Sequence, residues 1–131
     1  LYELKQLGIE VLGVDSSSYA RSHAKVAILP GLQSQHIANP FDLVLAIGLV
    51  YTLNLGQAME LIRQLERVAH KAFITLASYE TEEDLRLFRQ WTLLGTTILR
   101  KDDWREVLKH CGYTGDYWLV NAETLRLRLE R

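Results

Sequence analysis

Apolar and polar residues follow two different patterns along this chain. Four short runs are almost wholly apolar and are bounded by turn-forming or polar residues: 9–14, 25–29, 41–48 and 72–78. Such runs predict strands buried on both faces of a parallel sheet. Between them, apolar residues recur every three or four positions, which predicts helices over 17–24, 55–70 and 81–91, and the tail of a helix at 1–7. Strands and helices therefore alternate.

The last third of the chain changes this pattern. A further helix is predicted there. Asp102 is expected to cap its start, and Gly112 is expected to end it. Residues 113–120 and 124–130 are then strand-like, the second with strict alternation of apolar and polar positions, and the three residues between them are few enough for a hairpin. The predicted fold is α/β: a Rossmann-like three-layer sandwich with a mostly parallel sheet and a C-terminal antiparallel hairpin. A length of 131 residues suits one domain, 1–131.

Composition narrows the classes of function. The formal net charge is −1 and the two signs are interspersed, so the chain offers no broad basic surface for a nucleic-acid backbone. No run approaches the roughly 18 apolar residues that a membrane span needs. Cys111 is the single cysteine and cannot form an internal disulfide, which favours a reducing cytoplasm. The four histidines have no metal-ligand spacing, and no metal site is expected. A small-molecule ligand fits best.

The carboxyl ends of parallel strands are where α/β sheets bind ligands. Asp15, Ser16 and Ser17 follow the first predicted strand directly. An acid in this place can accept hydrogen bonds from both ribose hydroxyls of a nucleotide. The same residue types also cap helices. From the residues alone, Asp15 is either a ribose ligand or a helix cap.

Three segments carry a resemblance to a known family: IEVLGVDSSSYA, PFDLVLAIGLVYTL and WTLLGTTILRKDDWREVLKHCGYTGDYWLV. They resemble class I S-adenosylmethionine-dependent methyltransferases of the type-11-like group. The resemblance implies methyl transfer from S-adenosylmethionine to an unidentified acceptor, and it names no catalytic residue. It makes Asp15 the ribose ligand, with Ser16 and Ser17 in the same turn. Ile47 and Gly48 would pass beside the methionine part of the cofactor.

The chain departs from that family in two places. The family's first strand and glycine-rich loop are missing, so we expect an N-terminally truncated piece of a longer domain. The segment after the second predicted strand lacks the acid that contacts adenine, and an amide of Gln33, Gln35 or Asn39 would replace it. Two alternatives remain: a non-catalytic, methyltransferase-like interaction or scaffold domain, and an NAD-binding domain.

Aromatic residues near the expected ligand edge have two interpretations. Tyr51 and Tyr79 follow predicted strands, where a phenol can orient a substrate or pack a loop. Packing is the preferred interpretation for both. Trp91 and Trp104 fall at core-facing helical positions and are predicted to be structural.

Overall fold

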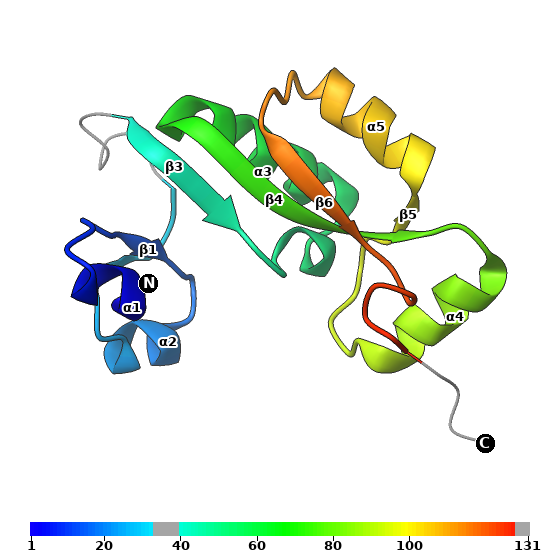
Figure 1. Cartoon of the computed structure of the whole chain (residues 1–131), viewed down its shortest axis with the longest axis horizontal. Helices are drawn as coiled ribbons and strands as arrows, with labels where there is room; N and C mark the ends of the chain where they lie inside the picture. The colour runs from blue at the N-terminus through cyan, green and yellow to red at the C-terminus, as the bar shows by residue number, and fades with distance from the viewer. Residues whose placement is uncertain (33–39, 128–131) are drawn as a thin grey trace. The chain divides into compact units, whose positions relative to one another are not determined.

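The computed structural model describes residues 1–32 and 40–127. The chain divides into two compact units, Leu1–Ala38 and Asn39–Arg131 (Figure 1). Each unit is described by itself below. Among the described residues, no helix is both long and apolar enough to cross a membrane.

The first unit consists of two helices and two very short strands. In chain order these are α1 (Tyr2–Gln6), β1 (Gly13–Val14), α2 (Ser18–His23) and β2 (Ile28–Leu29). The two strands are parallel, with Gly13 opposite Ile28 and Val14 opposite Leu29. They are shorter than the predicted runs 9–14 and 25–29. Within residues 1–32 only Gly13 is buried, so this unit has no side-chain core of its own.

A parallel sheet organises the second unit. Its strands are β3 (Phe41–Ala46), β4 (Ala69–Tyr79), β5 (Leu99–Arg100) and β6 (Asp116–Val120). All three of the others pair with β4, and every pairing is parallel. The connecting segments hold the 3-10 turn η2 (Val50–Thr52) and the helices α3 (Leu55–Val68), α4 (Glu82–Trp91) and α5 (Lys101–His110). The predicted α/β class with alternating strands and helices and a mostly parallel sheet, compatible with a Rossmann-like fold, is confirmed.

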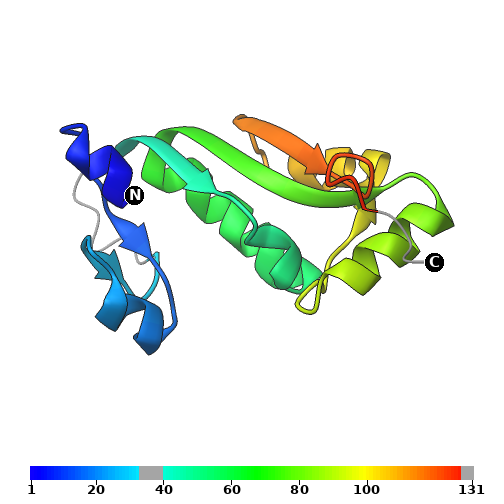
Figure 2. The ribbon, with the colours of Figure 1, turned by 60° about the horizontal axis from the view of Figure 1, so that its bottom comes forward.

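The core of this unit lies between β4 and its helices. In Figures 1 and 2, α3 runs alongside β3 and β4. The helix turns one apolar face inward: Ala58, Ile62, Leu65 and Val68 are all buried. Three alternate residues of β4 are buried as well: Ala72, Ile74 and Leu76. Because successive side chains of a strand point to opposite sides, these three share one face of the sheet. Burial of these side chains is the main force that holds helix to sheet.

Side chains at the helix starts explain where the helices begin. Asn54 and Gln57 form a reciprocal capping box on α3, and Thr81 with Asp84 forms the predicted one on α4. The prediction for α5 is wrong in one respect. That helix begins at Lys101 without a side-chain cap, and Asp102 lies in its first turn. There Asp102 accepts a 2.8 Å hydrogen bond from Arg105 instead of capping the helix.

Gly112 ends α5, as predicted. It adopts a left-handed conformation with φ of 68°, and its N–H donates to the carbonyl of Lys109 at 3.1 Å. Glycine reaches this conformation without the steric cost that a Cβ would bring.

The predicted C-terminal antiparallel hairpin is wrong. β6 runs parallel to β4, with Phe73 opposite Asp116 and Ala77 opposite Val120. After β6 the chain turns over residues 122–126 instead of starting a second strand. Asn121 and Thr124 close this turn, because each side chain accepts a 2.8 Å hydrogen bond from the other's backbone N–H. The end of the alternating run, residues 128–131, lies outside the described part.

Candidate functional site

The predicted ribose residues share one tight turn after β1. The Asp15 N–H donates to the Leu29 carbonyl at 3.0 Å, which continues the pairing of β1 with β2. One carboxylate oxygen of Asp15, Oδ1, accepts the Ser17 N–H at 2.8 Å. The Ser17 hydroxyl accepts the Ala20 N–H at 3.2 Å and is the N-terminal cap of α2. Asp15 therefore orders the turn, and Ser17 starts the helix.

Arg21 locks the same turn from the helix side. Its Nη1 donates to two carbonyl oxygens, that of Asp15 at 2.9 Å and that of Ser16 at 2.6 Å. Among the described residues, no donor occupies Oδ2, the second carboxylate oxygen of Asp15, and the residue is exposed. The alternative prediction that Asp15 caps the helix is wrong, because Ser17 is the cap of α2 and Asp15 only orders the turn before it.

An aromatic pair on α2 follows this turn in the sequence. The rings of Tyr19 and His23 stack with their centroids 4.0 Å apart and an angle of 26° between their planes. His23 Nδ1 lies 2.9 Å from the Tyr19 carbonyl oxygen and 2.9 Å from the Ser22 hydroxyl, which fixes the imidazole ring. Tyr19 is 71% exposed. The sequence reasoning missed this pair, although two rings four positions apart on a helix were a usable signal.

Ile47 and Gly48, assigned to the same cofactor by resemblance, follow β3 in the second unit. Ile47 is 66% exposed. Gly48 has φ of 68°, and its N–H donates to the Thr75 hydroxyl of β4 at 2.8 Å. This bond fixes how the chain leaves β3. The structure thus brings Asp15, Ser16 and Ser17 together in one unit and places Ile47 and Gly48 in the other.

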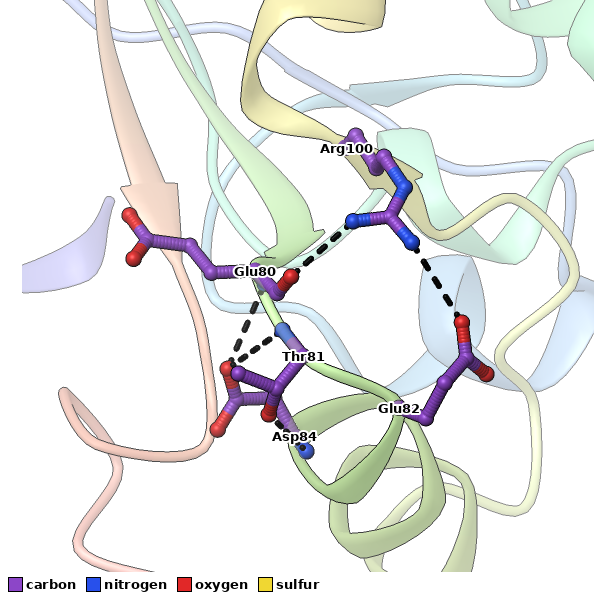
Figure 3. A network of polar contacts seen from close by, with 5 residues as sticks. All are labelled: Glu80, Thr81, Glu82, Asp84 and Arg100. Carbon is purple, nitrogen blue, oxygen red and sulfur yellow. Dashed lines mark hydrogen bonds and ion pairs between the residues drawn. The ribbon is translucent and has the colours of Figure 1, made fainter.

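The carboxyl ends of β4 and β5 carry a polar network (Figure 3). Arg100 donates to the Glu80 carbonyl at 2.9 Å and to the Glu82 carboxylate at 3.4 Å. Its guanidinium also lies 4.9 Å from the centre of the Tyr79 ring. Asp84 accepts the N–H groups of Glu80 and Thr81 at 3.2 and 3.1 Å. These bonds hold the turn from β4 into α4, and the surrounding carboxylates disfavour an anionic ligand there.

The aromatic residues near this edge are mostly structural. The Tyr51 ring meets Phe88 edge-on at 6.1 Å, in agreement with packing. Trp104 is fully buried, as predicted, and its indole N–H donates to the Ala77 carbonyl at 2.7 Å. The prediction for Trp91 is wrong, since it is 50% exposed. It is the last residue of α4, and only one side of its ring packs on Phe88, at 5.5 Å.

The remaining candidates are dispersed or lie outside the described residues. The proposed adenine amides of Gln33, Gln35 and Asn39 fall in the undescribed segment 33–39, as does His36. His70 lies on β4, and His110 is the last residue of α5. Cys111 is a buried free thiol. An open depression on the surface of α4 contains none of the predicted site residues and is lined by Glu82, Leu85, Arg86, Arg89 and Gln90.

Comparison with known proteins replaces the predicted family with a different similarity. No family model matches the chain, and no solved structure matches it. Over an alignment of length 125, the chain is 26% identical to "Nucleotide-binding protein NMB0738" of Neisseria meningitidis serogroup B, and the match covers 86% of this chain. It spans 44% of that relative's length. The predicted relationship to S-adenosylmethionine-dependent methyltransferases, and the methyl-transfer function with its scaffold alternative, are therefore wrong: the similarity found is to a nucleotide-binding protein.

Proposed function

We propose that this chain binds a nucleotide and that Asp15 accepts the hydrogen bonds of its ribose hydroxyls. The observation that carries the proposal is Oδ2 of Asp15, which accepts no hydrogen bond from residues 1–32 or 40–127 and is presented by a turn that Ser17 and Arg21 hold in place. The turn follows the carboxyl end of a strand in a parallel pair, which is the usual ligand edge of an α/β sheet. The similarity to a nucleotide-binding protein supports the same class of ligand.

The chemistry of the turn suits a neutral vicinal diol. An ionised carboxylate only accepts hydrogen bonds, and both ribose hydroxyls are donors. Hydrogen bonds to a charged group contribute about 1.5–3 kcal/mol each, more than those between neutral groups. Because Oδ1 is already engaged with the Ser17 N–H, the carboxylate cannot rotate freely, and little conformational entropy is lost on binding.

The substitution Asp15→Asn tests the proposal with little effect on the turn. The asparagine carbonyl can still accept the Ser17 N–H, but its amide nitrogen replaces the free acceptor by a donor. Titration calorimetry of the whole chain with ATP and GTP should show affinity at least about tenfold lower for Asp15→Asn. The control Glu10→Gln removes the same charge from an exposed residue of the same unit and should bind as the original chain does.

A second ligand series ties the loss to the sugar. 2′,3′-Dideoxy nucleotides should bind the original chain more weakly than the parent nucleotides do. The Asp15→Asn variant should bind the dideoxy nucleotides no more weakly than the parent nucleotides. Equal affinity of ribose and dideoxy nucleotides for the original chain would contradict the proposal. S-adenosylmethionine, the cofactor predicted from the resemblance, also contains adenosine and belongs in the same probe set.

We also propose a reducing, cytoplasmic location. It is supported by the single free thiol of Cys111, which is buried against the Met59 carbonyl, its sulfur 3.7 Å from that oxygen. Cysteines of this kind are common where glutathione and thioredoxin keep thiols reduced. Fractionation of cells that express the tagged chain should recover it with cytoplasmic markers, and recovery with an oxidising compartment would contradict the assignment.

A further inference from the structure

We propose that the stacked rings of Tyr19 and His23 are the platform on which the base of the nucleotide lies. The inference rests on the proposed function and adds a base subsite to the ribose subsite at Asp15. It follows from the position of the ring pair, from its exposure and from the bonds that fix it.

Tyr19 lies close to Asp15 along the chain. Tyr19 is the second residue of α2, and Asp15 lies four residues before it, at the end of β1. Ser17 and Arg21 fasten the turn between them to the helix, so the carboxylate and the aromatic ring belong to one rigid local structure. A nucleoside joins its sugar directly to its base. A ligand held at Asp15 therefore needs a partner for the base close by.

Most of Tyr19 remains exposed although its ring stacks on that of His23. His23 covers one face of the phenol, yet 71% of the residue remains accessible to water. The free face is flat and apolar. Every nucleobase has a π-face that can stack on such a ring, and removal of one aromatic residue weakens binding about 5- to 150-fold per stacked base.

The bonds to His23 fix the imidazole ring on which the Tyr19 ring stacks. The imidazole Nδ1 contacts both the Tyr19 carbonyl and the Ser22 hydroxyl at 2.9 Å. A ring held in this way loses little rotamer freedom on binding. Stacking on a ring reads the shape of the base and not its edge. We expect adenine and guanine nucleotides to bind alike, ahead of the smaller pyrimidines.

The test compares a ligand with and without a base. Adenosine 5′-monophosphate and ribose 5-phosphate share the sugar and the phosphate and differ only in adenine. The substitution Tyr19→Ala should weaken binding of adenosine 5′-monophosphate about tenfold or more and leave ribose 5-phosphate unchanged. Tyr19→Phe keeps the ring and should bind both ligands as the original chain does.

A control variant and a direct measurement complete the design. Tyr2→Ala removes another partly exposed tyrosine of the same unit, one that lies under the Lys25 ammonium, and should change neither affinity. In the original chain, NMR should show nuclear Overhauser contacts between the Tyr19 ring protons and the adenine H2 or H8 protons. Circular dichroism checks that every variant keeps its helix content.

The outcomes separate the platform from the proposed function. If Tyr19→Ala binds adenosine 5′-monophosphate normally while Asp15→Asn does not, the platform is refuted and the ribose site stands. If Tyr19→Ala weakens both ligands equally, Tyr19 only supports the helix, and the platform is refuted as well. If the original chain binds no nucleotide, both the proposed function and the platform are refuted.

Discussion

Trp104 gives the sharpest test of how the second unit is held together. The substitution Trp104→Phe keeps an aromatic ring but removes the indole N–H that donates to the Ala77 carbonyl at 2.7 Å. Trp104 is fully buried and Ala77 is 1% exposed, so water cannot replace the lost donor without a rearrangement of the core. The variant therefore leaves a buried acceptor without its side-chain partner.

Two costs add in this variant. A buried polar group left unsatisfied costs about 1–3 kcal/mol. The smaller phenyl ring also leaves a gap, at about 0.8 kcal/mol for each missing methylene-sized group. Together they predict a loss of about 2–4 kcal/mol in the free energy of unfolding. With a urea m-value of about 2 kcal/mol per molar, in the middle of the usual range, the midpoint of unfolding should fall by about 1–2 M.

Urea titration followed by circular dichroism at 222 nm measures this loss without relying on tryptophan fluorescence. The matched control is Trp91→Phe, because that side chain is half exposed and makes no hydrogen bond to a buried group among the described residues. The control should lower the midpoint only slightly. Equal shifts for the two variants would refute the reasoning, since they would show that the bond to Ala77 contributes nothing to stability.

Two further predictions concern α4 and the buried thiol. Thr81→Ala removes the hydroxyl that accepts the Asp84 N–H at 3.1 Å, and thermal unfolding should show a loss of about 0.5–2 kcal/mol in the free energy of unfolding. Thr81→Ser should restore that stability. No change for Thr81→Ala would mean that the capping box does not stabilise α4. Burial raises the pKa of the Cys111 thiol, so iodoacetamide should alkylate it far more slowly at pH 8 than it alkylates the urea-unfolded chain. Equal rates would contradict this burial.

The sign of the thiol effect on stability follows from the same shift. The unfolded thiol ionises at a lower pH than the folded one, because burial raises the folded pKa. At neutral pH both forms are protonated and the thiol contributes no pH dependence. Stability should then fall as pH rises through the ordinary thiol range towards the raised folded value, since ionisation favours the unfolded state.

Local signals in the sequence predicted most of the elements of the fold. The capping box of Thr81 and Asp84 and the terminating Gly112 were readable because each acts through hydrogen bonds to near neighbours. The direction of β6 was not readable. A run of strand-forming residues indicates a strand, but its partner strand and its direction depend on where α5 returns the chain to the sheet.

The candidate site was predictable in part for the same reason. Asp15 stood out because an acid that ends an apolar run has few common roles, but the sequence did not tell that Ser17 caps the helix while Asp15 orders the turn before it. Tyr19 was overlooked, since an aromatic residue on a short helix is usually explained by packing. Only its exposure and its stacking on His23, which are properties of the folded chain, single it out.

The parallel pairing of β4 with β6 has a consequence for how the chain is made. Phe73 finds its partner Asp116 only after α4, β5 and α5 have been synthesised. At about 5–20 residues per second, the ribosome needs roughly 3–10 s to extend the nascent chain from β4 to the end of β6. During that interval one edge of the longest strand faces water without its partner, and such edges recruit other chains. Rapid translation of this stretch, or a chaperone that shields it, should therefore improve the yield of folded protein.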